Sequence, residues 1–565
     1  MWGSKLGLSS IRPFRLFNSF PFFLFLSVIS LHTFGQSDPG EIHGNLNVDA
    51  QYYNEDSTIG ATVPPEQMGI NAWGNVIYTR GKFSAGLRFE SYEPSMLGYP
   101  AGQPYSGTGI GYRYVSYKVD ELEVTLGNFF EQFGSGMIFR AYEERGLGVD
   151  NAMDGVRLRY NAGKGLYLKG AVGRQRFGFE DGFTKGPGIV RAIDAELSMN
   201  ELFPSLADNG KNITLGGSFV SKFQEDKDPL LVLPENVGSF AGRARYTNAK
   251  WNIFAEYAHK INDPNVQNDF IYKDGQGMVL QANYSIKGFA FGLGAHTYDN
   301  MSFQSDRAAP TGFDLNVNFL PPLTLPHTYN LPATLYPYAT QPNGEVGFQG
   351  DLVYKFKKKS KLGGKYGTTI AINYASVFSL DSTAIPNDEN LDGYKTNFFS
   401  PGDQMYFQDF NIKLHKKFKN KSELVLTYIN MVYDIDVIQG KPGDPVIFAD
   451  FAIVDYSIPL KKRHNLRIEL QHLWTKQDKG NWITGLAEYT ISPGWFFSIL
   501  NQFNYGGPVD TKQINYPLGS VGYTKGGNRI QVNYGRQRAG IFCVGGVCRQ
   551  VPAANGLSVS ITSTF

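Results

Sequence analysis

Leu557-Ser-Val-Ser-Ile-Thr-Ser-Thr-Phe565 closes the chain, and its pattern bears on the fold of the whole protein. Side chains of an extended strand alternate between two faces, so Leu557, Val559 and Ile561 share one face with Phe565. Serine and threonine occupy the other face. An apolar edge strand at the end of a soluble protein invites aggregation. In an outer-membrane β-barrel the last strand pairs with the first, which leaves no edge. The alternative at this point is the closing strand of a soluble β-sandwich.

The composition favours an all-β protein that does not bind nucleic acid. The 565-residue chain has a net charge of +2, so it lacks the basic excess that contacts phosphates. Aromatic residues make up 14% of the chain and 64 residues are glycine, as expected of strands, turns and interfacial girdles. Beyond the N-terminal segment no run of 18 apolar residues occurs, so no transmembrane helix is expected. A membrane location would therefore require a barrel.

The N-terminal segment has the pattern of a signal peptide. Lys5, Arg12 and Arg15 form a basic region, and residues 20–31 form an apolar region too short to span a bilayer. Small residues precede a cut near Gln36, and no cysteine follows for lipid attachment. We expect residues 1–35 to be removed on export, with a retained membrane anchor as the alternative.

The two cysteines predict a disulfide bond. Cys543 and Cys548 flank Gly545-Gly546, a two-residue hairpin turn that would place the cysteines directly opposite each other. Such a pair has the closer Cα spacing that suits a disulfide bond. Metal binding by two lone cysteines without a nearby histidine is the weaker alternative.

From residue 41 onward the chain is a succession of strands whose connections alternate between short and long. Short connections are expected at residues 80–82, 120–121, 162–165, 247–250, 286–288, 417–421, 460–464, 492–494 and 525–527. Long ones are expected near residues 131–153, 301–344 and 381–403, among others. The tally is about 24 strands, an even number. The prediction is one domain over residues 36–565, a large closed antiparallel transmembrane barrel with short periplasmic turns and long extracellular loops.

The strand faces opposite the apolar ones carry many charges. The predicted lumen residues are Arg157, Arg159, Arg243, Arg245, Lys413, Arg467 and Glu469, and Lys169, Asp194, Glu196, Asp409 and Asn411 lie on the same faces. An unpaired buried charge costs on the order of several kcal/mol, so the lumen is either wet or lined by opposite charges in pairs. Arginine predominates, which favours anionic solutes. In the alternative, the pairs only support the wall.

Three segments together resemble a known family. They are GNFFEQFGSGMIFRAYEERGLGVDNAMDGVRLRY (residues 127–160), TLYPYATQPNGEVGFQGDLVYKF (residues 334–356) and QRAGIFCVGGVCRQVPAANGLSVSITSTF (residues 537–565). The chain resembles an uncharacterised family of Bacteroidota outer-membrane proteins, catalogued as a domain of unknown function, across its mature length. The resemblance implies an outer-membrane barrel. It implies no activity and no catalytic residues.

Two long connections are candidates for functional loops. Residues 131–153 carry mixed charges among glycines, and in the order of long loops they correspond by analogy to the one that folds into the channel of general porins. An ordered surface loop is the alternative. Residues 301–344 contain seven prolines and several aromatic residues, so the segment could cover the barrel or contact a partner.

A third connection resembles half of a calcium-binding loop. Asp388, Asn390 and Asp392 precede Gly393 with the spacing of alternate oxygen ligands. The twelfth position is Phe399 instead of a bidentate glutamate. A solvated acidic loop is therefore the favoured interpretation, calcium is the alternative, and no other cofactor is expected.

No enzyme motif occurs in the sequence. A Gly-x-Ser-x-Gly elbow, a His-Glu-x-x-His helix and a phosphate-binding loop are all missing, and no two of the eight histidines have metal-ligand spacing. We therefore expect a protein without enzymatic activity.

The patterns together predict a porin-like barrel in the outer membrane that passes small solutes. The first strand begins five residues after the expected cut, which leaves no room for an N-terminal plug domain. Phe565 is the candidate signal for the outer-membrane assembly machinery. The alternative is a non-conducting structural or assembly subunit of an outer-membrane complex, which a large exposed apolar patch would favour. The expected partners are the lipid bilayer, the assembly machinery and small solutes, and under the alternative also other outer-membrane proteins.

Overall fold

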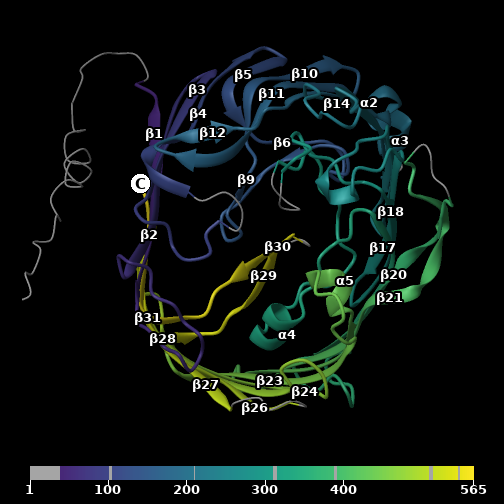
Figure 1. Cartoon of the computed structure of the whole chain (residues 1–565). Helices are drawn as coiled ribbons and strands as arrows, with labels where there is room; N and C mark the ends of the chain where they lie inside the picture. Colours follow the sequence, from purple (N-terminus) through teal and green to yellow (C-terminus); the bar gives the residue numbers. More distant parts are fainter. Residues whose placement is uncertain are drawn as a thin grey trace, which may run out of the picture. The chain divides into compact units, whose positions relative to one another are not determined.

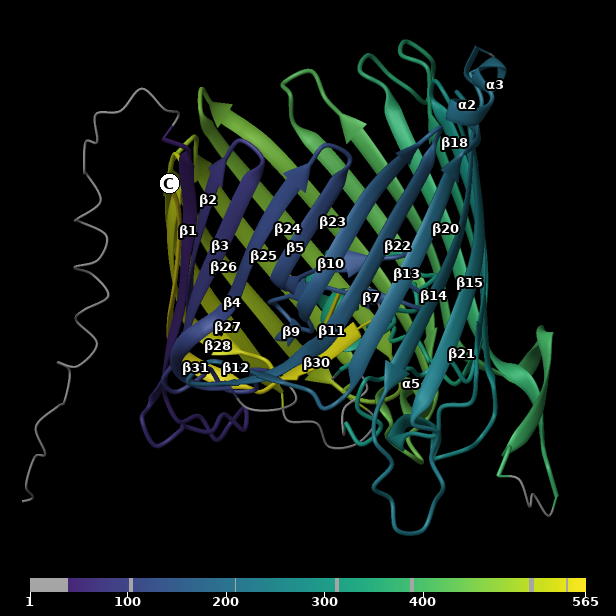
Figure 2. The same ribbon diagram turned by 90° about the horizontal axis from the view of Figure 1, so that it is seen from above.

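Twenty-four antiparallel strands form a closed barrel in the computed structural model, as the sequence predicts. The structure describes residues 39–100, 105–208, 210–309, 315–386, 391–507, 513–544 and 547–565. The chain divides into a short unit, Met1–Glu41, and a large unit, Ile42–Phe565, which carries the barrel. Figure 1 looks along the barrel, and Figure 2 shows the strands along their length.

Each barrel strand pairs with its neighbours in sequence, and the last strand pairs with the first. The barrel strands are β1 (Glu41–Tyr53), β2 (Met68–Arg80), β3 (Phe83–Tyr92), β4 (Tyr105–Val119), β5 (Leu122–Phe129), β10 (Met153–Gly163), β11 (Leu166–Glu180), β13 (Ile189–Ser198), β14 (Asn212–Phe223), β15 (Asn236–Thr247), β16 (Trp251–Lys260), β17 (Gly275–Ile286), β18 (Phe289–Asp299), β19 (Gly344–Lys355), β20 (Thr368–Ala384), β21 (Tyr394–Lys417), β22 (Glu423–Tyr433), β23 (Ile447–Lys461), β24 (His464–Thr475), β25 (Asn481–Ile491), β26 (Trp495–Gly506), β27 (Ile514–Lys525), β28 (Asn528–Gln537) and β31 (Ala554–Thr564). The seam is closed by nine residue pairs from Asn45↔Thr564 to Tyr53↔Gly556.

The connections contain further short elements. They are β6 (Glu131–Gln132), β7 (Arg140–Ala141), β8 (Glu143–Glu144), β9 (Val149–Asp150), β12 (Phe183–Lys185), β29 (Gly540–Val544), β30 (Val547–Val551), α2 (Met199–Leu202), α3 (Pro204–Asp208), η2 (Val266–Asn268), α4 (Asn330–Leu335) and α5 (Ile435–Gln439). Figure 1 shows β6, β9, β29, β30, α4 and α5 inside the ring of strands. None of the helices in the described ranges is long and apolar enough to cross a lipid bilayer.

Strand alternation separates an apolar outer face from a charged inner face. On β13, Ile193 is 57% exposed, whereas the side chain of the next residue, Asp194, is fully buried against Arg243. Leu470 and Ile499 repeat the outward pattern on later strands, with 52% and 70% of their surface exposed. A period of two places one apolar side chain outside for each polar side chain inside.

Neighbouring strands fit closely because aromatic rings fill the space above glycines. A Cβ atom at Gly86 would lie 2.2 Å from the ring of Tyr114 on the adjacent strand, and Gly522 lies in the same way under Phe496. At the seam, the Phe565 ring covers Gly44, where a Cβ atom would lie 2.2 Å from the ring. The terminal aromatic residue therefore packs on the first strand at the point of closure.

The connection predicted over residues 381–403 is wrong in its extent. β20 continues to Ala384, β21 begins at Tyr394, and these two residues pair with each other. Threonine and aromatic residues in this segment favour extended backbone, so the strands continue past the wall. Register shifts near Leu380 turn the hairpin away, and Figure 2 shows it at the side of the barrel. Near the turn of the hairpin, the Tyr394 hydroxyl donates to Asp299 Oδ1 at 3.0 Å.

Ile193→Arg tests the assignment of the outer face to lipid. A cationic side chain at the middle of an outward-facing strand should lower the free energy of unfolding in lipid vesicles by about 2–4 kcal/mol. Denaturant titration of the vesicle-embedded barrel measures this, with Ile193→Val as the matched control. Equal stability of the arginine and valine variants would contradict an outer face in contact with lipid.

Candidate functional site

Most predicted lumen charges form pairs across the inner face of the wall. Arg157 NH2 lies 2.7 Å from Glu123 Oε1, and Arg467 NH2 lies 2.9 Å from Asp455 Oδ2. Arg243 NH2 lies 2.8 Å from both Asp194 Oδ1 and Glu196 Oε1, and Arg159 NH2 lies 2.8 Å from Glu131 Oε2. Glu469 accepts from Arg467. Opposite charges on neighbouring strands thus neutralise much of the inner face.

Two predicted lumen cations contact aromatic rings instead of carboxylates. The Arg245 guanidinium lies 4.6 Å from the centre of the Phe254 ring, and Lys413 Nζ lies 5.9 Å from that of Tyr329. Both side chains are exposed. A ring face attracts a cation without neutralising it, so these positions retain positive charge.

The segment 131–153 folds into the barrel. Of the two interpretations that the sequence leaves open, the structure therefore has the inward loop and not the surface loop. Phe133, Met137 and Phe139 are completely buried, and they form one cluster with inward-facing wall residues such as Val220 and Val279. Residues 301–309 and 315–320 of the long connection between β18 and β19 complete this cluster. We call these three segments the first plug.

Hydrogen bonds join the parts of the first plug to each other and to the wall. The Asn318 amide donates to the Met137 carbonyl at 3.2 Å, and the Phe319 N–H donates to the Gly136 carbonyl at 2.9 Å. The Ser135 N–H donates to Glu256 Oε2 on β16 at 2.8 Å. The plug therefore has one defined position against the inner face.

A buried ion network anchors the first plug to β3 and β11. Arg176 of β11 binds Glu90 of β3 at 2.7 Å and Asp150 of the plug at 2.9 Å. Arg88 of β3 binds the same two carboxylates, and its NH1 lies 2.9 Å from Glu143 Oε1. The side chains of Arg88, Arg176, Glu90 and Asp150 are at most 5% exposed. Because both arginines share carboxylates from wall and plug, the network fixes one to the other.

The wall half of this network, Arg88, Glu90 and Arg176, is not predicted from the sequence, whereas the charges in residues 131–153 are. The one available signal is that Arg88 and Glu90 lie two apart on the polar face of a strand. Their partner Asp150 lies 62 residues from Arg88, and nothing in the sequence pattern joins them.

A second group of connection residues packs on the other half of the wall. Leu331, Leu335 and Tyr336, in and after α4, are buried against wall residues that include Phe407 and Phe451. α5 joins the same cluster. The Leu331 N–H donates to Gln471 Oε1 on β24 at 2.9 Å, and the Tyr433 hydroxyl donates to the Pro337 carbonyl at 3.1 Å. We call residues 329–338 together with α5 the second plug.

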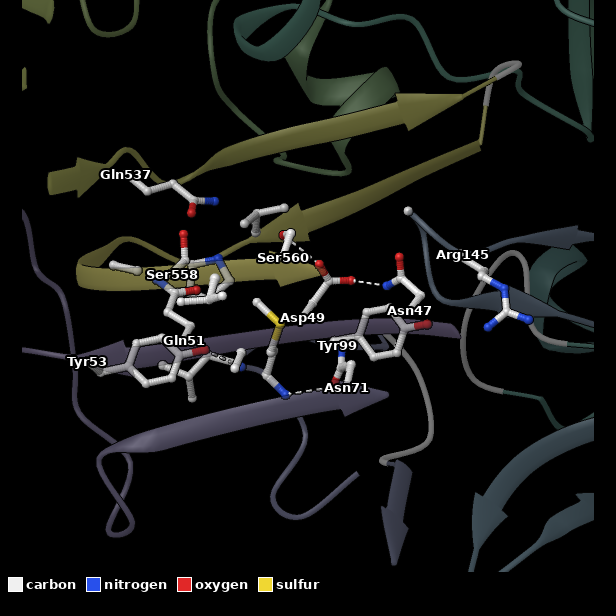
Figure 3. A pocket seen from close by; sticks show the side chains of 18 of the residues that line it. Asn47, Asp49, Gln51, Tyr53, Asn71, Tyr99, Arg145, Gln537, Ser558 and Ser560 are labelled. Carbon is white, nitrogen blue, oxygen red and sulfur yellow. Dashed lines mark hydrogen bonds between the residues drawn. The ribbon is translucent and has the colours of Figure 1, made fainter. Parts of the chain in front are cut away.

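A cavity of about 420 Å³ with polar and apolar lining remains beside the seam of the barrel (Figure 3). Its seam wall presents Asn47, Asp49 and Gln51 of β1 with Ser558 and Ser560 of β31. Asp49 accepts from Asn47 Nδ2 at 2.7 Å and from Ser560 Oγ at 2.6 Å. We call this space the seam cavity.

Arg145 of the first plug also lines the seam cavity. Its guanidinium lies 4.1 Å from the centre of the Trp73 ring and 2.9 Å from Glu143 Oε1. Figure 3 shows Arg145 on a different segment from Asp49. The carboxylate of Asp49 and the Arg145–Glu143 ion pair thus belong to different parts of the chain around this space.

A second cavity, of about 470 Å³, adjoins the first. Both are lined by Leu97, Val551 and Pro552. Arg538, just after β28, and Lys441 and Lys479 of the long connections also line the second cavity. We call it the basic cavity.

The calcium and disulfide predictions remain untested. Asp388 and Asn390 lie outside the described residues, and no group of three or more potential metal ligands occurs within them. For the cysteines, the backbone register of β29 and β30 places Cys543 opposite Cys548. Their side chains lie outside the described part of the structure, so the bond remains a prediction.

Arg176→Leu tests whether the ion network holds the first plug. Removal of the Arg176 guanidinium leaves the buried carboxylates Glu90 and Asp150 without one of their cationic partners. The free energy of unfolding should therefore fall by about 3–5 kcal/mol. Protease cleavage within residues 131–153 should rise as well. The matched control is Lys82→Met, which removes an exposed pair with Asp120 and should cost less than about 1 kcal/mol. Equal costs for the two variants would contradict an anchoring role.

Comparison with known proteins places the chain in a family without assigning an activity. No curated protein matches the sequence. Among solved structures, the translocation pore of the P pilus usher PapC has 9% identity and a TM-score of 0.40, covering 93% of this chain and 99% of its own. The siderophore receptor PirA from Pseudomonas aeruginosa has 8% identity and a TM-score of 0.41, with coverages of 94% and 81%. OccAB4 from Acinetobacter baumannii has 11% identity and a TM-score of 0.36, with coverages of 83% and 99%. Values this low say nothing about what the present chain binds.

The family of unknown function DUF6029 matches residues 17–565, and the chain belongs to that family.

Proposed function

We propose that this protein is an outer-membrane channel for small solutes whose lumen is narrowed by its own connections. The observation that carries the proposal is the seam cavity, a space left between the first plug and the wall whose seam side presents amides, hydroxyls and Asp49. The two plugs occupy other parts of the inner face with apolar clusters. Solutes would therefore pass along the seam, between polar side chains, instead of through an unobstructed barrel.

The outer surface supports insertion of the barrel in a membrane. Aromatic side chains face outward within a few residues of the short turns, as in the girdles of outer-membrane barrels. They are Tyr117, Tyr160, Trp251, Tyr354 and Trp495. Tyr52, Phe448 and Trp474 face outward near the other end. Exposed aliphatic side chains such as Ile193 lie between the two levels. An apolar band between aromatic rings is the surface that lipid covers.

The seam cavity has the features of a selective passage. Asp49 and Arg145 line it from different parts of the chain, and amides and hydroxyls supply neutral hydrogen-bonding groups. Such a lining exchanges hydrogen bonds with a hydrated solute without binding it tightly. The cavity volume of about 420 Å³ suits molecules of the size of a small metabolite.

One observation favours the alternative of a subunit in an outer-membrane complex. Leu230 and Val232, in the connection between β14 and β15, are 91% and 86% exposed. Asp228 Oδ1 accepts from the Leu230 N–H at 2.8 Å, so this exposed turn is ordered. Phe399 of the β20–β21 hairpin is 70% exposed. Ordered apolar side chains exposed to this degree are suited to contact another protein.

Ser558→Trp tests passage along the seam. The indole would occupy the seam cavity, so single-channel conductance in a planar bilayer should fall at least several-fold. Leu557→Trp is the matched control, because Leu557 lies on the outer face of the same strand and is 41% exposed. Its conductance should equal that of the unaltered protein.

Two results would contradict the proposal. Equal conductance of the Ser558→Trp and Leu557→Trp variants would exclude the seam as the route. A correctly folded barrel that carries no current would exclude a channel and favour the alternative of a complex subunit.

A further inference from the structure

The basic cavity contains a buried arginine whose charge no carboxylate neutralises. Arg538 is only 9% exposed. Its guanidinium donates to the Thr334 hydroxyl at 2.5 Å, to the Ala539 carbonyl at 3.3 Å and to Gln502 Oε1 at 3.4 Å. All three acceptors are neutral. Among the described residues, no carboxylate lies within ion-pair distance of Arg538, so its hydrogen bonds are satisfied but its charge is not.

Of the other buried arginines in the described residues, Arg88, Arg176 and Arg243 of the wall each contact at least two carboxylates. Arg307, in the connection after β18, donates only to neutral acceptors of Gln224 and Pro234, but it lines neither cavity. Burial of an uncompensated charge is unfavourable, and a folded chain normally places a counter-charge beside it. Arg538 departs from this pattern at a place where the chain also leaves an empty space of about 470 Å³. The geometry therefore leaves room for a counter-ion that the chain does not provide.

The remaining charged groups around the cavity increase the positive potential. Lys441 and Lys479 line the cavity with exposed side chains, and Asp478 is the one carboxylate in the described lining. Asp478 Oδ2 accepts from the Tyr336 hydroxyl at 3.3 Å. Burial lowers the pKa of Arg538 to about 10, which still leaves the guanidinium charged at neutral pH. Three cations therefore face one carboxylate.

The lining also indicates the kind of anion that fits. A guanidinium presents a planar fork of N–H donors that matches the oxygens of a carboxylate or phosphate. Arg538 is held in place because its guanidinium lies 5.2 Å from the centre of the buried Trp482 ring. Leu335, Ile435 and Val551 supply apolar surface for a short carbon skeleton.

We propose that the basic cavity binds a small anionic solute through a carboxylate or phosphate group held by Arg538, with Lys441 and Lys479 at its edge. Because the cavity adjoins the seam cavity, bound anions would be delivered to the passage. That last step rests on the proposed channel function, whereas the binding itself does not.

Calorimetric titration of the full-length protein in detergent tests the binding. The probes are succinate and inorganic phosphate, with putrescine as the cationic control. One or both anions should bind saturably with a stoichiometry of one and more weakly as salt is raised, and putrescine should not bind. Succinate alone would indicate a carboxylate site, phosphate alone a phosphate site.

Variants locate the binding. Arg538→Gln should weaken anion affinity at least tenfold. Lys441→Gln and Lys479→Gln should each weaken it several-fold, and their exposed positions protect against loss of folding. Lys82→Gln, which removes an exposed lysine that lines neither cavity, should leave affinity unchanged.

Two outcomes would overturn the inference. One is the absence of saturable binding of both anions to the folded protein. The other is wild-type affinity in the Lys441→Gln/Lys479→Gln double variant and in a folded Arg538→Gln variant. A barrel that conducts but binds neither anion would overturn this inference alone. A barrel that binds an anion but carries no current would overturn the channel alone.

Discussion

Burial of charge inside a wide barrel is the constraint on which the rest of the structure depends. Strand alternation sends every second side chain of 24 strands inward, and side chains of the wall alone do not fill a ring of this size. Connections from the long-loop end fill part of it. The charges of the inner face then need partners, and Arg88 and Arg176 find them in Glu90 and in Asp150 of the first plug. Displacement of the first plug would leave buried charges without partners, which is energetically unfavourable. The ion pairs that neutralise the interior therefore also keep the lumen narrow.

The sequence pattern predicts the wall far better than the interior. A period of two identifies strands, the outward face and closure at Phe565, because each depends on neighbouring residues. The same period predicts that Arg157 and Arg243 face inward, but not which carboxylate each one meets. Contacts of the plugs join distant residues, such as Asn318 and Met137, 181 positions apart, so no local pattern reports them. The turn-forming residues within 381–403 predict a loop. Pairing between β20 and β21 instead stabilises an extension of both strands as far as Ala384 and Tyr394.

The plugs and the seam divide the interior into parts with different chemistry. The first and second plugs present apolar clusters to the middle strands, whereas the strands that meet at the seam keep a polar inner face of amides, hydroxyls and Asp49. The basic cavity lies next to this polar space and holds the one deeply buried arginine of the described cavity linings that has no carboxylate partner, Arg538. Apolar side chains thus fill some sectors of the barrel interior, and polar side chains line another sector. Small differences in which side chains line the seam would change what passes.

Amide hydrogen exchange of the purified barrel tests most directly whether its connections are packed inside it. Exchange is slow where backbone groups are buried and bonded, and fast where they are exposed. The account predicts that residues 133–139 and 331–338 exchange as slowly as the barrel strands, while residues 225–232 of the exposed β14–β15 connection exchange quickly. Fast exchange of both plug segments, at the rate of that connection, would contradict a lumen narrowed from within.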